Sequence, residues 1–178
     1  MINRYIKGIY MRFDLKVGEV IAIVLIAGAL SLGFLGGNPS AQVPSVPSLS
    51  TLDHFTGVTW SVVNSFSGVA DSSPTSFLQS FGSDAISYVN LTDAAGDLMT
   101  VLEVNFPSAN SALSYLNSVS PISPQMMNGV WVSTYSLGQV EIVYLVSGSH
   151  FVQISYVGSS GALPSLTSME QLGLSLIR

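Results

Sequence analysis

An uncharged apolar segment near the start of the chain, residues 20–37, most constrains how this sequence can fold. At 1.5 Å per residue, a helix of this length just spans a hydrocarbon core of about 30 Å. Four of the chain's five basic residues precede it, namely Arg4, Lys7, Arg12 and Lys16. Because basic residues beside a spanning segment stay on the cytoplasmic side, the sequence predicts a single-pass protein of the cell membrane. The N-terminus is expected in the cytoplasm and the C-terminal domain outside it.

Two other interpretations of this segment stay open. A cleaved secretory signal, which would leave a secreted protein, has a shorter apolar stretch followed by small residues at the cleavage site. Ala27-Gly28-Ala29 has that form, but only a few apolar residues precede it. A pilin-type leader is suggested by Glu19 at the head of the apolar helix, although no clear processing site precedes Glu19.

The next segment, residues 38–51, reads as a linker because it combines small polar residues with Pro39, Pro44 and Pro47. Prolines lack a backbone N–H and cannot join the interior of a sheet, so strand donation between filament subunits is disfavoured. The expected layout is a basic cytoplasmic segment (1–19), a transmembrane helix or signal anchor (20–37), the linker (38–51) and one extracytoplasmic domain (52–178).

Hydrophobic periodicity predicts the elements of this domain. Residues 98–106 alternate in polarity, which indicates a strand with Glu103 and Asn105 on its solvated face. Ser108 can cap a helix over 109–119. Further on, the sequence predicts an antiparallel meander over 130–137, 140–146 and 151–157 and a last helix over 164–177; earlier it predicts strands over 58–63 and 85–91 and a short helix over 74–81.

This order of elements indicates an α+β fold. We expect an antiparallel sheet of about five to six strands, packed on one face by two to three helices. Ferredoxin-like and cystatin-like open sandwiches are both compatible with that order.

Charge is sparse in the expected domain. From residue 36 onward there are eight carboxylates against the single cation Arg178, a net charge of −7, while the whole chain has 30 serines. Such an acidic domain excludes nucleic-acid binding through a basic patch. Since its carboxylates would be protonated below about pH 4, we hypothesise an acidic external medium.

The sequence shows none of the familiar catalytic motifs. The chain has no cysteine, so disulfides and thiolate metal sites are excluded. His54 and His150 lack the spacing of metal motifs, and no G-x-S-x-G accompanies them. Glu103 and Glu141 could pair as a general acid and base only if their strands were neighbours. The sequence therefore predicts no catalytic residue, no cofactor and no metal.

Two kinds of surface feature are candidates for modification or binding. Asn90-Leu91-Thr92 is an N-glycosylation sequon on the exported side, so Asn90 is a candidate glycosylation site. Trp131, Tyr135 and Tyr156 are candidate binding-surface residues, because a sheet with helices on one side leaves one aromatic row exposed.

The favoured function is a non-catalytic surface, adhesion or accessory and assembly module. Its expected partners are the lipid bilayer, through the N-terminal helix, and a protein at the cell surface. The alternatives are a hydrolase or ligand-binding accessory subunit, whose site would arise from scattered Ser, Asp and His, and a pilin-like filament subunit.

Overall fold

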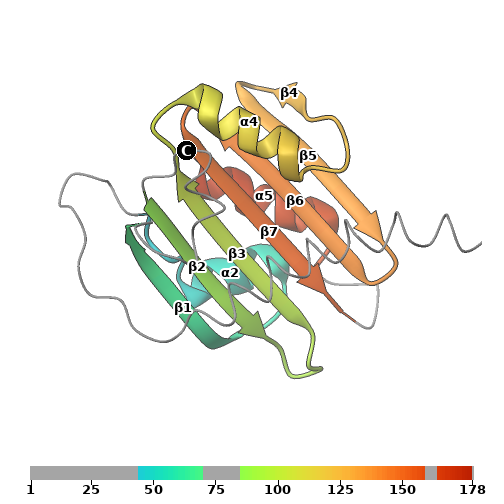
Figure 1. Ribbon diagram of the computed structural model, residues 1–178. Helices are drawn as coiled ribbons and strands as arrows, with labels where there is room; N and C mark the ends of the chain where they lie inside the picture. Colours follow the sequence, from blue (N-terminus) through green and yellow to red (C-terminus); the bar gives the residue numbers. More distant parts are fainter. Residues whose placement is uncertain (1–43, 70–84, 159–163, 178) are drawn as a thin grey trace, which may run out of the picture.

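A computed structural model describes residues 44–69, 85–158 and 164–177 of the chain (Figure 1). The expected basic segment, the apolar segment 20–37 and the helix over 74–81 lie outside these residues. Within the described ranges, no helix combines the length and the apolarity needed to cross a bilayer.

Seven antiparallel strands form one sheet in the order β1-β2-β3-β7-β6-β5-β4. They are β1 (Ser61–Val69), β2 (Ala85–Thr92), β3 (Leu98–Asn105), β4 (Gln125–Met127), β5 (Val130–Leu137), β6 (Val140–Ser147) and β7 (His150–Val157). The first three strands form one meander and the last four another, and the pairing of β3 with β7 joins them. The sheet is therefore larger than the five to six strands expected.

Three helices accompany the sheet: α2 (Leu49–Thr56), α4 (Ala109–Val119) and α5 (Leu166–Leu176). Each begins after a serine whose hydroxyl accepts a hydrogen bond from a backbone N–H in the first turn. The caps are Ser48, Ser108 and Ser165, and such caps satisfy otherwise unpaired N–H groups. The α+β class with an antiparallel sheet and helices is thus confirmed.

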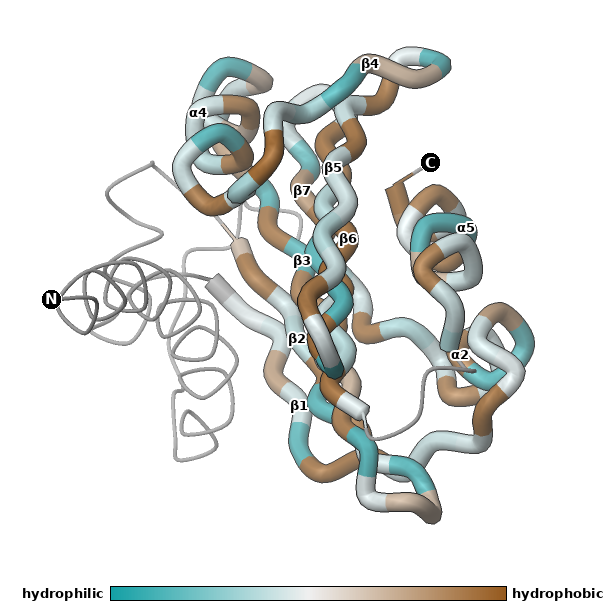
Figure 2. The backbone as a smooth tube through the Cα atoms, turned by 90° about the vertical axis from the view of Figure 1, so that its right-hand side faces the viewer, coloured by the Kyte–Doolittle hydropathy of each residue, from teal (hydrophilic) through white to brown (hydrophobic). Residues whose placement is uncertain are grey.

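The helices lie on both faces of the sheet (Figure 2). Helix α4 covers one face, whereas α2 and α5 cover the other. The expectation of helices on one face only is wrong, because the central strands carry apolar side chains on both of their faces. In β3, Met99 and Val101 face α2 and α5, while Leu102 and Val104 face α4.

On the α4 side, aromatic and aliphatic side chains form one buried cluster. Tyr115 from α4 meets Phe151 of β7 edge to face, with ring centroids 4.9 Å apart. Other members are Ile86, Tyr88, Leu102, Val104, Phe106, Ala112, Leu116, Ile142, Tyr144 and Val146.

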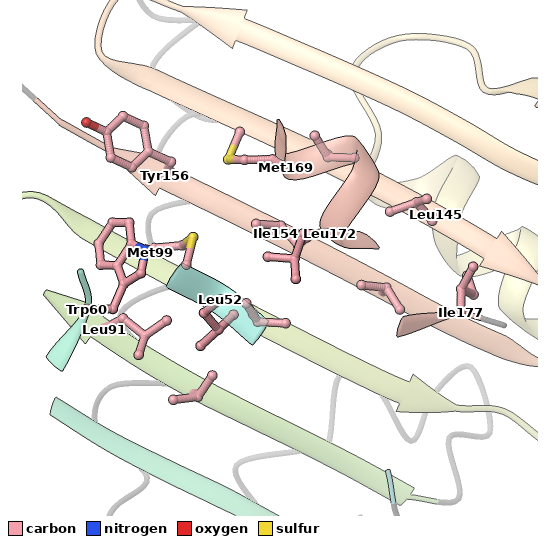
Figure 3. Packing of buried hydrophobic residues seen from close by; sticks show 14 of the residues in the cluster. Leu52, Trp60, Leu91, Met99, Leu145, Ile154, Tyr156, Met169, Leu172 and Ile177 are labelled. Carbon is pink, nitrogen blue, oxygen red and sulfur yellow. The ribbon is translucent and has the colours of Figure 1, made fainter. Parts of the chain in front are cut away.

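A second buried cluster lies between the sheet and helices α2 and α5 (Figure 3). Leu52, Met169 and Leu172 come from the helices and pack on strand residues such as Ile154. Trp60 at one end donates its indole N–H to Thr56 Oγ1 over 2.8 Å.

Residues just before α2 contact the domain. Val46 packs against the second cluster, and Ser67 Oγ donates a hydrogen bond to the carbonyl of Pro44 over 2.9 Å. Helix α2 itself begins at Leu49. The last part of the segment 38–51 therefore packs on the sheet.

Gly173 lets α5 approach β6 closely. A Cβ there would lie 2.3 Å from Cδ1 of Leu145, which is fully buried. Alanine usually favours a helix over glycine by about 1 kcal/mol, but overpacking costs roughly 1–3 kcal/mol. We expect Gly173→Ala to lower the free energy of unfolding by about 1 kcal/mol in urea titrations. In a double-mutant cycle, Gly173→Ala should lower the free energy of unfolding less in the Leu145→Ala background than in the wild type. If the two effects were fully additive, a clash with Leu145 would be contradicted.

Stability should fall at alkaline pH because of Tyr115 and Tyr144. Burial raises the pKa of both phenols well above the usual 10.0. The unfolded chain therefore loses these protons first, so stability is complete below about pH 10 and declines above it. Tyrosinate absorbance should show both residues ionising together with loss of near-ultraviolet circular dichroism. Tyr144→Phe should move the midpoint to higher pH, whereas ionisation of all tyrosines near pH 10 in a folded domain would refute this account.

Candidate functional site

The three aromatic candidates do not share a face. Trp131 and Tyr135 of β5 are half-buried and pack against the α4-side cluster. Tyr156 of β7 is buried in the cluster on the opposite side of the sheet. Because helices cover both faces, these residues do not form one exposed aromatic row.

Tyr156 instead fastens the end of the sheet. Its hydroxyl donates to Asp97 Oδ2 over 2.6 Å, at the turn between β2 and β3. Burial, this hydrogen bond and nearby carboxylates raise the pKa of Tyr156. A Cβ on Gly158 would lie 1.8 Å from the Tyr156 hydroxyl, so only glycine fits beside it.

Asn90 lies within β2, between β1 and β3. Its Nδ2 donates to Asn64 Oδ1 over 2.7 Å, and its Oδ1 accepts from Thr100 Oγ1 over 2.6 Å. A glycan attached to Nδ2 would take one of its two hydrogens, so the bond to Asn64 would have to use the other. Glycosylation at Asn90 stays a prediction.

Glu103 and Glu141 do not form an acid–base pair. Their strands β3 and β6 are separated by β7. Glu141 lies opposite Tyr156, which in turn lies opposite Met99 of β3. Glu103 lies four positions beyond Met99, a distance of about 13 Å along the strand.

The alternation of polar and apolar residues in this strand predicted Glu103 on a solvated face, but this prediction is wrong. Glu103 is only 4 % exposed. It lies directly opposite Ser87 of β2, which is 1 % exposed, and near His150 of β7. We call Ser87, Glu103 and His150 the buried polar cluster; all three lie on the α2 and α5 side of the sheet.

The atoms of this cluster are incompletely paired. His150 Nε2 and Glu103 Oε2 are 3.2 Å apart, but their geometry is not that of a hydrogen bond. Ser87 Oγ and Glu103 Oε1 are buried and have no hydrogen-bond partner either. Buried polar groups are normally satisfied, so this cluster requires an explanation.

The arrangement does not match a serine–histidine relay. Ser87 and Glu103 are cross-strand neighbours, and His150 lies beyond them on β7. Since Ser87 Oγ makes no hydrogen bond, no base is positioned to take its proton. Within the described ranges, no three His, Cys, Asp or Glu side chains converge as metal ligands.

A different surface lies at the β4 edge of the sheet. Residues 104–140, which include α4, β4 and β5, contain no charged side chain. The large apolar side chains exposed along this stretch are Ile122, Met126, Met127 and Leu137. We call these four residues the uncharged edge. The sequence shows that this stretch has no charged residue, but only the strand order shows that the stretch forms an edge of the sheet (Figure 1).

The comparisons with known proteins concern the fold. No family model matches the chain, and no curated protein sequence does. Among solved structures, the chain is similar to the crystal structure of the extracellular domain of PknH from Mycobacterium tuberculosis. The TM-score is 0.52 at 10 % identity, over 74 % of this chain and 90 % of that chain. At this identity the likeness shows a shared α+β fold, one that PknH uses outside the cell.

Proposed function

We propose that this chain is a membrane-anchored extracytoplasmic module that acts by binding a protein at the cell surface and catalyses no reaction. The basic residues before segment 20–37 support the anchor and its orientation. The fold likeness to an extracellular domain is consistent with that placement.

The uncharged edge carries the binding proposal. Interface cores are depleted in charged residues and enriched in methionine, which adapts its shape to a partner. Met126 and Met127 are 52 % and 48 % exposed and are consecutive residues of β4, so this edge strand presents a methionine on each of its two faces. Their surroundings lack charge although the domain is acidic elsewhere.

The opposite edge of the sheet is less suited to this role. Strand β1 also exposes Val62 and Val63, but its register shifts between Val62 and Asn64. Such a bulge disrupts the ladder of an edge strand and protects it from pairing. We therefore assign partner binding to the β4 side.

The orientation can be tested because the chain has no cysteine. Ser114 is exposed on α4, and Asn3 belongs to the basic segment. A membrane-impermeant maleimide should label Ser114→Cys in intact cells, because the domain lies outside. It should label Asn3→Cys only after lysis. Labelling of both sites, or of neither, in intact cells would exclude the proposed topology.

Charges on the uncharged edge should release the partner. Burying an unpaired carboxylate is unfavourable, so Met126→Glu/Met127→Glu should reduce co-purification from native membranes by about tenfold or more. Leu98→Glu is the matched control, since Leu98 is similarly exposed at the far end of β3. A wild-type chain that elutes as a monomer without partners would overturn the proposal, as would equal losses in both variants.

A further inference from the structure

The buried polar cluster presents three atoms that lack hydrogen-bond partners in the described part of the molecule. They are Ser87 Oγ, Glu103 Oε1 and His150 Nε2. Cross-strand pairing places Ser87 and Glu103 on the same face, where opposite Cβ atoms lie about 5 Å apart. The contact of His150 with Glu103 brings the imidazole to the same carboxylate.

An unsatisfied carboxylate at this depth is unfavourable for the fold. A buried ionised group requires a counter-charge and hydrogen bonds to its remaining lone pairs. Glu103 Oε1 accepts no hydrogen bond from the described residues, and the imidazole of His150 is the one described basic group at this carboxylate. A ligand that brings a full positive charge and N–H donors would relieve this deficit.

We infer that Ser87, Glu103 and His150 bind the primary ammonium group of a small molecule. An ammonium group has three N–H donors and no acceptor. The cluster offers three atoms without hydrogen-bond partners in return: a carboxylate oxygen, a hydroxyl oxygen and an imidazole nitrogen, Nε2, which accepts a hydrogen bond when it carries no proton. The positive charge compensates Glu103, so donor number and charge both match.

Other ligand classes fit less well. An anion would meet the carboxylate of Glu103, and the described ranges contain no lysine or arginine to hold it. A metal ion prefers three or more protein ligands, and the described residues bring no such group together. A neutral hydroxyl compound would leave the buried charge without compensation.

The location also suits a cation. His150 has 24 % of its side chain exposed, so the cluster lies near solvent on that side, although the Nε2 atom itself is buried. The acidic domain around it raises the local concentration of cations. Binding here is separate from the uncharged edge, whose strand residues lie on β5 and β4, on the far side of β6.

Methylammonium is the probe that tests the inference. The ¹⁵N-labelled full chain, purified in mild detergent, is titrated with methylammonium chloride at constant ionic strength. Amide signals of Ser87, Glu103 and His150 should shift and saturate. Tetramethylammonium, which has the charge but no N–H donor, should give no saturable shift.

Glu103→Gln should weaken methylammonium binding at least tenfold, since it removes the charge and keeps the shape. Glu141→Gln is the matched control, because Glu141 Oε2 is also buried without a partner on the same face but lies on β6, away from Ser87; this variant should bind as the wild type does. If Glu103→Gln does not fold, Ser87→Ala removes a single hydroxyl and should weaken binding severalfold.

Three results would overturn the inference: no saturable shift, equal binding of tetramethylammonium, or unchanged binding in both Glu103→Gln and Ser87→Ala. Met126→Glu/Met127→Glu should still bind methylammonium. Failure of the ammonium site is thereby distinguished from failure of the partner surface.

Discussion

The pairing of β3 with β7 is the interaction on which the rest of the structure depends. It runs over eight residue pairs, from Leu98 opposite Val157 to Asn105 opposite His150. It joins two locally formed meanders, and such a distant pairing requires that a long loop be closed first. Once formed, it places both strands at the middle of a wide sheet, where each face has to be covered. Helix α4 covers one face and α2 with α5 the other, so the layered architecture follows from this one ladder.

Much of the chain's local structure was predictable because its signals are local. Glycines at positive φ, such as Gly138 and Gly148, mark the hairpins of the last meander, and Ser108 marks the start of α4. Strand β4 was missed because three residues carry no periodicity. Helix α2 was missed because it starts at Leu49, within a segment that resembles a linker. The covering of both faces could not be read from alternation, because it depends on which strands become central.

The same limit applies to the candidate site. Residue type identified the aromatic side chains, but only strand pairing shows that Tyr135 and Tyr156 lie on opposite sides of the sheet. Alternation placed Glu103 in solvent, whereas the side chain is buried in its position between Ser87 and Val152. The single charged residue in a mostly apolar strand was the available signal. It acquires meaning only beside His150, which is distant in sequence and is brought near by the central ladder.

The two proposed binding regions follow from how this domain distributes charge. Most of the sheet is buried on both faces, so contacts with other molecules are restricted to its edges and to polar positions left inside. At the β4 edge, missing charge favours an extended apolar contact, whose strength should depend little on salt. At Glu103, one buried charge favours a small cation held by hydrogen bonds. Because β7 contributes His150 and also pairs with β6, which continues the ladder to β5 and β4, both regions are built on one rigid sheet. A ligand at the cluster can influence the edge only by altering that sheet, which makes independent binding at the two regions the simplest consequence of the fold.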